Sequence, residues 1–164
     1  MRSFLLLAGA IALAIVFGPR FCRAPLLPAG AEAPPFSLDR PDRPGERLTA
    51  GDLRGRRSVL FFWTVWCPAC DPMLAPLDAL ARRRPDVLVA AIHSDGDADP
   101  TRVTRRAAGA PALVHVSGGD RIMGSYRVSA FPTTYLVDSA GRICAGFSGR
   151  TSAGAISDAL DACR

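Results

Sequence analysis

The sequence predicts an α/β fold in which a mixed central sheet is flanked by helices on both sides. Two continuous apolar runs, at residues 58–64 and 86–93, have the length and composition of strands that are buried on both faces. Predicted strands and helices alternate until the last three elements, which are two strands and a helix, and this order is typical of a mixed sheet. A Cys-x-x-Cys motif, Cys67 to Cys70, follows the first apolar run directly.

The chain of 164 residues is long enough for one domain with an N-terminal appendage. Residues 1–18 are predicted to be a signal-anchor or a signal peptide, because their apolar run is short for a spanning helix and suits a signal sequence. No small-x-small site follows the run closely, which favours an uncleaved anchor, with cleaved export as the alternative. Residues 19–35 are rich in Pro, Ala and Gly and are predicted to be a linker, and residues 36–164 form the predicted domain.

The elements of this domain are predicted from local patterns. Short strands at 36–38 and 47–49 precede a capped helical turn at 49–53, and an acidic loop lies at 95–99. Apolar spacing indicates the remaining elements: strand 58–64, helix 68–83, strand 86–93, helix 100–108, strand 112–116, helix 120–126, strand 133–137, strand 142–147 and helix 152–163. Pro72 and Pro76 fall inside the first helix, so a kink or an irregular first turn is expected there.

The formal net charge of +5 is not evidence for nucleic-acid binding. Three arginines lie in the first 24 residues, which contain no acidic residue, and the rest of the chain has 17 arginines against 15 acidic residues. This balance excludes an electrostatic nucleic-acid binder.

The Cys-x-x-Cys motif predicts a redox-active dithiol, Cys67 with Cys70. A helix that begins at the motif directs its N-terminal N–H groups toward the first sulfur and favours the thiolate. Pro68 suits the first helical turn, where its missing N–H has no partner to lose. We therefore expect Cys67 to be the exposed nucleophile with a low pKa, and Cys70 to be the sheltered partner that closes the disulfide.

Two other interpretations of the motif are weaker. A structural zinc site needs four ligands, but there is no second Cys-x-x-Cys pair and the only histidines are His93 and His115. Thr64, three residues before Cys67, matches a fragment of the peroxiredoxin pattern, yet the proline required four residues earlier is replaced by Leu60. We expect neither a metal nor a cofactor.

Four motifs, in this order and spacing, resemble the thioredoxin superfamily, and specifically the membrane-tethered TlpA/ResA-like redoxins of bacterial envelopes. They are Ala-Pro-Pro-Phe-Ser-Leu at 33–38, Asp-Leu-Arg-Gly at 52–55, Phe-Trp-x-x-Trp-Cys-Pro-Ala-Cys at 62–70, and the segment 126–142. The resemblance covers about residues 33–160 and implies a thioredoxin-like fold. It also implies that Pro132 is a cis-proline facing the dithiol. By the same resemblance, the residues that position the substrate are Trp66, Pro68, Ala69, Phe131 and Pro132.

Two departures from the family pattern remove its proton acceptors for Cys70. Met73 stands where such proteins often have a glutamate, and Phe61 stands where thioredoxin has a buried aspartate. Asp71 and His93 are the remaining candidates for a base, with water as the default acceptor.

The predicted reaction is thiol–disulfide exchange that reduces protein disulfides. The Pro-Ala dipeptide between the cysteines lacks the histidine of strong oxidants, so we expect a potential of about −270 to −200 mV. The resemblance implies a membrane electron donor, a domain outside the cytoplasm, and substrates such as those of cytochrome c maturation. The alternatives are a disulfide oxidant, a copper-resistance-linked disulfide oxidoreductase, and a copper-binding module, although copper chaperones of this fold use a wider cysteine spacing and a distant histidine.

Three further cysteines remain outside the motif. Alternation in the strand 142–147 places Ile143, Ala145 and Phe147 on one face and Cys144 on the other, and Cys163 falls on the buried stripe of the last helix. A Cys144–Cys163 disulfide suits an oxidising compartment. Two separate thiols, one buried and one at the chain end, are the alternative. Cys22 is left over and could pair between chains.

Overall fold

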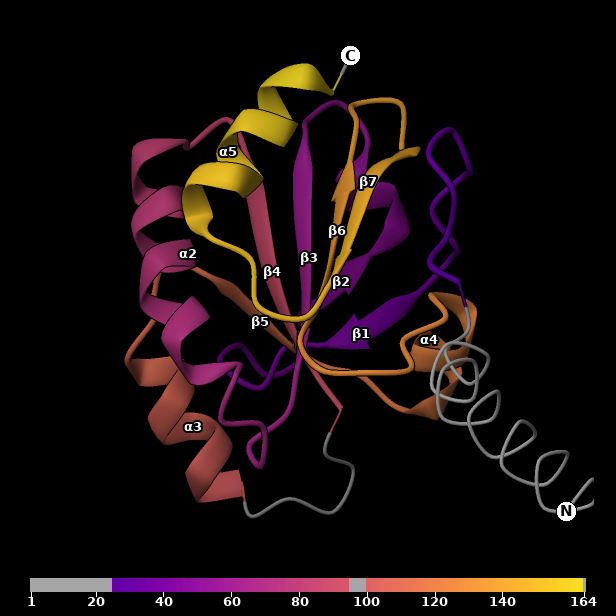
Figure 1. Ribbon diagram of the computed structural model, residues 1–164. Helices are drawn as coiled ribbons and strands as arrows, with labels where there is room; N and C mark the ends of the chain where they lie inside the picture. Colours follow the sequence, from indigo (N-terminus) through magenta and orange to yellow (C-terminus); the bar gives the residue numbers. More distant parts are fainter. Residues whose placement is uncertain (1–24, 95–99, 164) are drawn as a thin grey trace, which may run out of the picture.

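The computed structural model describes residues 25–94 and 100–163 (Figure 1). Its elements are β1 (Ser37–Asp39), β2 (Arg47–Thr49), the short 3-10 helix η2 (Ala50–Leu53), β3 (Ser58–Trp63), α2 (Asp71–Arg83), β4 (Leu88–His93), α3 (Pro100–Ala108), β5 (Val114–Ser117), α4 (Asp120–Ser125), β6 (Thr133–Val137), β7 (Ile143–Ser148) and α5 (Ala153–Ala162). This is the predicted order. The predicted anchor at 1–18, Cys22 and the acidic loop lie outside the described residues. None of the described helices is long and apolar enough to cross a membrane.

The central sheet has five strands in the order β5-β4-β3-β6-β7, with β3 in the middle. β3 pairs in parallel with β4, and β4 in parallel with β5. The two C-terminal strands run antiparallel, β6 beside β3 and β7 beside β6. The sheet is therefore mixed, as predicted, and β1 and β2 form a separate hairpin.

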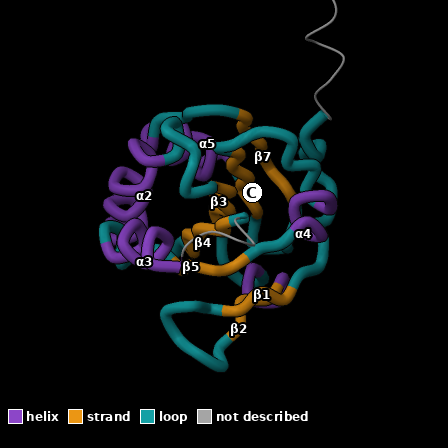
Figure 2. Tube along the Cα trace, turned by 90° about the horizontal axis from the view of Figure 1, so that it is seen from below, coloured by secondary structure: helices purple, strands orange, loops and turns teal. Residues whose placement is uncertain are grey.

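Each face of the sheet carries its own hydrophobic layer. The side chains of Val59, Phe61 and Trp63 belong to the core beneath α2, α3 and α5. Those of Leu60 and Phe62 belong to the core beneath α4 and the β1–β2 hairpin. Figure 2 shows these two groups of elements on opposite sides of the strands. Because β3 is covered on both faces, it reads as a continuous apolar run.

Residues 26–35, part of the predicted linker, pack on the domain. The amide of Leu27 donates to the Tyr135 hydroxyl at 3.1 Å, and the Tyr126 hydroxyl donates to the carbonyl of Pro34 at 3.0 Å. The amide of Gly30 donates to the carbonyl of Ile143 at 2.8 Å. Burial raises the pKa of the Tyr126 hydroxyl, which therefore stays a neutral donor. The packed domain thus begins before residue 36, because proline-rich chain can lie extended along a sheet and still form hydrogen bonds.

Helix α2 begins three residues later than the predicted start at 68. The motif forms a tight turn in which the Cys70 amide donates to the Cys67 carbonyl at 3.1 Å, and the Met73 amide then donates to the Cys70 carbonyl at 3.0 Å. Pro72 has no N–H to donate to the carbonyl four residues earlier, so regular helical bonding cannot begin at Pro68. Pro76 lies inside α2, as expected from the sequence.

β7 contains an irregularity that the alternation argument missed. Leu136 pairs with Ala145 but Val137 pairs with Ile143, so Cys144 is the extra residue of a bulge. As a result Ile143 packs in the core beneath α4, whereas Cys144 and Ala145 pack on the core beneath α5. Ala145 and Phe147 share a face as predicted, but the prediction that Ile143 lies with them and Cys144 opposite is wrong, because an extra residue in one strand shifts the side-chain alternation.

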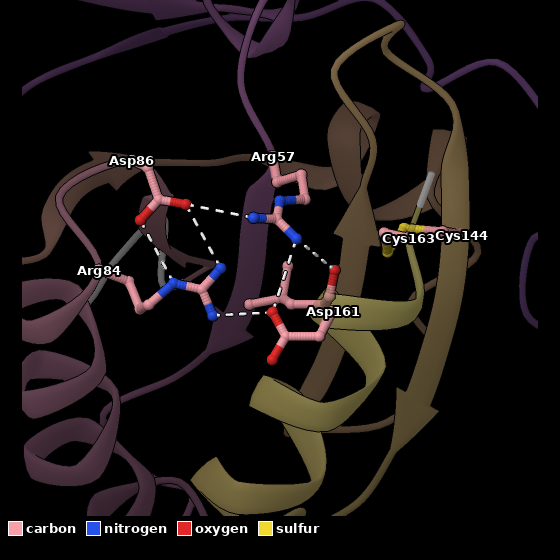
Figure 3. Close-up of polar contacts among 7 residues, drawn as sticks. Arg57, Arg84, Asp86, Cys144, Asp161 and Cys163 are labelled. Carbon is pink, nitrogen blue, oxygen red and sulfur yellow. Dashed lines mark hydrogen bonds and ion pairs between the residues drawn. A yellow bond between two sulfur atoms is a disulfide. The ribbon is translucent and has the colours of Figure 1, made fainter.

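The bulge directs Cys144 toward α5, where it forms a disulfide with Cys163 at a Cα–Cα distance of 5.6 Å. A cluster of charged groups holds the same end of α5 (Figure 3). Arg57 donates to the carbonyl of Leu160 at 3.0 Å, and Arg84 donates to Asp161 at 3.0 Å. Both arginines also contact Asp86, and hydrogen bonding from Arg84 is the main cause that lowers the pKa of that carboxyl. A disulfide to β7 and contacts with two arginines thus hold the last turn of α5 in place.

Replacing Cys144 and Cys163 together by alanine should lower the free energy of unfolding by about 3 kcal/mol, because the bond closes a loop between residues 19 positions apart. Urea unfolding of the oxidised full-length protein measures this. A Cys67→Ala/Cys70→Ala control should lose less stability, since that pair is only three positions apart. An unchanged urea midpoint for the Cys144/Cys163 variant would contradict the stabilising role.

Arg127 is the one described residue other than glycine with a positive φ, at 52°. It ends the turn after α4, where its amide donates to the carbonyl of Gly124 at 3.0 Å. A Cβ in this conformation is crowded by the backbone, whereas glycine adopts it without strain.

Arg127→Gly should therefore raise the free energy of unfolding by about 0.5–1 kcal/mol. The substitution removes the backbone strain, but the greater freedom of glycine in the unfolded chain offsets part of this gain. Arg127→Ala is the matched control, because it removes the guanidinium and keeps the Cβ. The interpretation fails if alanine stabilises the protein as much as glycine does in the same denaturation experiment.

Candidate active site

The dithiol lies where β3 ends and before α2 begins. Cys67 and Cys70 form a disulfide with their Cα atoms 5.4 Å apart. The Cys67 amide donates to the Thr64 carbonyl at 3.3 Å, so the turn is bonded to the end of the strand. Cys70 is the N-cap residue of α2, which places the pair against the N-terminal turn of a helix. A partial positive charge at this position favours a thiolate in the reduced form.

The two sulfur-bearing residues are both buried in this oxidised form, although to different degrees. Cys67 is 5% exposed and Cys70 is 0% exposed. The predicted exposure of Cys67 is therefore wrong for the disulfide form, because the neighbouring residues of the turn project outward instead. Trp66 is 64% exposed, and Pro68 and Ala69 are exposed as well. Cys67 is still the more exposed of the two cysteines, as predicted, since solvent reaches Cys67 and does not reach Cys70.

Phe131 and Pro132 lie in the loop before β6, and the ring of Phe131 contacts the motif. The ring of Phe131 meets that of Trp66 edge to face, with the centroids 5.6 Å apart, and Phe131 also packs on the core cluster that contains both cysteines. The Phe131–Pro132 peptide bond is cis. Trp66 and Phe131 thus form an aromatic edge beside the disulfide.

A cleft of about 370 Å³ lies beside the first turns of α2, which follow the motif. α2 contributes Pro72, Met73, Pro76 and Leu77 to its wall, and the chain leading into α5 contributes residues 150–153. The α2 wall of this cleft is apolar, whereas Arg150, Thr151 and Ser152 make the opposite wall polar.

The two candidate bases, Asp71 and His93, each contact another polar side chain. Met73 and Phe61, which depart from the family pattern, are buried apolar side chains that cannot accept a proton. Asp71 is held by Arg106, with the Nε of Arg106 2.9 Å from a carboxylate oxygen. His93 is buried at the end of β4 and has its Nε2 3.1 Å from the Ser117 hydroxyl.

Arg106 is a residue of this site that sequence reasoning missed. It lies on α3, which Figures 1 and 2 both show beside the first turns of α2. Its guanidinium contacts Asp71 and the carbonyl of Val65. No pattern in the sequence separates Arg106 from Arg102 and Arg105 on the same helix, so only the fold could reveal it.

The Cys144–Cys163 disulfide stands apart from this site. Arg57, which precedes β3, donates to α5 beside Cys163, whereas the dithiol follows the last residue of β3. The two disulfides therefore lie at opposite ends of the central strand.

Comparison with known proteins supports this description. The redoxin family model matches residues 28–162. The thiol-disulfide oxidoreductase ResA of Bacillus thuringiensis is 28% identical over 141 residues, which cover 85% of this chain and 80% of ResA. The thioredoxin-like protein YneN of Bacillus subtilis is 30% identical over 70% of this chain and 68% of YneN. The structure of DsbF from Mycobacterium tuberculosis aligns with a TM-score of 0.69 and 21% identity, covering 79% of this chain and 95% of DsbF.

A disulfide-bonded Cys-x-x-Cys pair between the central strand and a helix, together with a cis-proline before β6, places the protein among the thiol–disulfide oxidoreductases with a thioredoxin-like fold. Within that class, the chain belongs to the redoxin family and is of the TlpA/ResA-like type.

Proposed function

We propose that this protein reduces disulfides of other proteins outside the cytoplasm, with Cys67 as the attacking thiol and Cys70 as the resolving thiol. The observation that carries the assignment is the difference in burial between the two cysteines, 5% exposed against 0%. Of the two cysteines, Cys67 is the one with any exposed surface, and the exposed ring of Trp66 precedes it directly.

The reaction consists of two exchanges. The Cys67 thiolate attacks one sulfur of the substrate disulfide, forming a mixed disulfide and releasing the other substrate sulfur as a thiolate. The Cys70 thiol loses its proton to water and attacks the sulfur of Cys67. The second substrate sulfur leaves, so the substrate gains two electrons and the protein ends with the Cys67–Cys70 disulfide.

The residues between the two cysteines favour the reducing direction. Pro68 and Ala69 supply no charge that would stabilise the reduced form strongly, as a histidine between the cysteines does in strong oxidants. We propose a potential of about −270 to −200 mV and a membrane electron donor that returns the dithiol to the reduced form. Proteins of cytochrome c maturation are a candidate class of substrate.

The cellular location is proposed from two features. The apolar residues 3–18 suit an uncleaved signal-anchor that keeps the domain beside the inner membrane, with a cleaved, periplasmic form as the alternative. The Cys144–Cys163 disulfide is a bond that persists in oxidising compartments.

Cys67→Ser should abolish the reduction of insulin, whereas Cys70→Ser should accumulate mixed disulfides with the substrate, because only the second thiol can release them. Non-reducing electrophoresis with mass spectrometry identifies the trapped cysteine. Cys144→Ser is the control and should retain insulin reduction. If the Cys70→Ser variant forms no adduct while Cys67→Ser does, the two roles are reversed.

Trp66→Ala should slow the reduction of insulin by about tenfold while changing the reduction of a small aromatic disulfide by less than about twofold, because the ring contributes docking surface and not chemistry. Its exposure of 64% means that the urea midpoint should not change. Equal slowing with both substrates would show that Trp66 acts on the dithiol itself.

A further inference from the structure

One guanidinium holds the chain on both sides of the dithiol. The side chain of Arg106 donates to the carbonyl of Val65, two residues before Cys67. Its Nη2 and Nε also approach the two carboxylate oxygens of Asp71, the residue after Cys70, at 3.0 and 2.9 Å. A planar guanidinium can bind a carboxylate with two parallel N–H groups and still donate a further N–H to a carbonyl, whereas an ammonium group lacks this planar fork.

The position of Asp71 gives this contact an electrostatic consequence. Asp71 is the first residue of α2, so its carboxylate lies at the same helix N-terminus that favours the Cys67 thiolate. An unpaired carboxylate there would repel the thiolate and raise the pKa of Cys67. The paired Arg106 offsets this charge.

The geometry points to Arg106 as a positioning residue for the dithiol: it fixes the turn through Val65 and neutralises Asp71, and thereby keeps the pKa of Cys67 low and the reduced form stable. This inference rests on the proposed role of Cys67 as the attacking thiol. An ordinary exposed ion pair adds little to stability. The proposed effect of the Arg106–Asp71 pair is instead on the pKa of the Cys67 thiol, and not on the stability of the fold.

Other charged groups border the same end of the sheet and stay constant across the variants. His93 ends β4 and packs edge to face with Trp63 at 6.1 Å, and Arg150 borders the cleft beside Met73. Arg105 is exposed on the same turn of α3 as Arg106 and provides a matched control, since its replacement removes the same charge without touching Val65 or Asp71.

The test measures alkylation of each cysteine in the reduced full-length protein as a function of pH, resolved by peptide mass spectrometry, together with the glutathione redox equilibrium at pH 8. Arg106→Gln should raise the midpoint for Cys67 by about 0.5 pH unit and make the dithiol about threefold easier to oxidise. Asp71→Asn should lower the midpoint by a similar amount. The double variant Asp71→Asn/Arg106→Gln should return close to the wild type, because both charges are gone.

Arg105→Gln should leave both quantities near the wild-type values, since exposed charges are screened by salt. The inference is overturned if Arg106→Gln matches Arg105→Gln, or if the double variant keeps the full displacement of Arg106→Gln. If the arginine variants do not fold, Asp71→Asn still tests the inference. An alkylation midpoint of Cys67 that is not lowered in this variant would show that the charge of Asp71 does not affect the thiol. Wild-type labelling of Cys70 before Cys67 would instead overturn the proposed roles of the two thiols.

Discussion

The central constraint in this structure is the burial of β3 on both faces and along both edges. Its six residues lie between two hydrophobic layers, with β4 on one side and β6 on the other. The backbone at the end of such a strand has little freedom, because moving it would disturb both layers and both ladders. The turn that carries Cys67 and Cys70 is held in place by the end of this strand. A fixed position allows Cys67 to react first with a substrate sulfur and then with Cys70.

The two disulfides lie at opposite ends of β3 and differ in how much of the chain they connect. The Cys67–Cys70 bond joins residues three positions apart and fastens no distant part of the chain. The Cys144–Cys163 bond joins β7 to the end of α5, and Arg57 and Arg84 hold the same helix end. Since α5 packs on α2, the helix behind the dithiol is supported from the opposite end of the molecule. A labile bond can therefore open and close while a stable one preserves the fold.

Among the described residues, few charged groups lie beside the dithiol. Met73 and Phe61, next to the motif in the sequence or on β3, are both buried among apolar neighbours and supply no charge. Beside the motif, Asp71 and Arg106 contact one another, and Arg150 borders the cleft next to Met73. The helix terminus therefore carries a paired carboxylate, which leaves the partial positive charge of the helix to favour the thiolate.

Local patterns in the sequence determined most of the fold and the chemistry. β6 at 133–137 and α3 at 100–108 have the predicted bounds, and the motif alone indicated the dithiol, because these features depend on neighbouring residues. The tertiary structure decided the rest. The bulge at Cys144, the packing of residues 26–35 and the contact of Arg106 with Val65 and Asp71 depend on which distant segments meet. Periodicity shows which face of an element is buried, but the partner of a single side chain is set only when the elements pack.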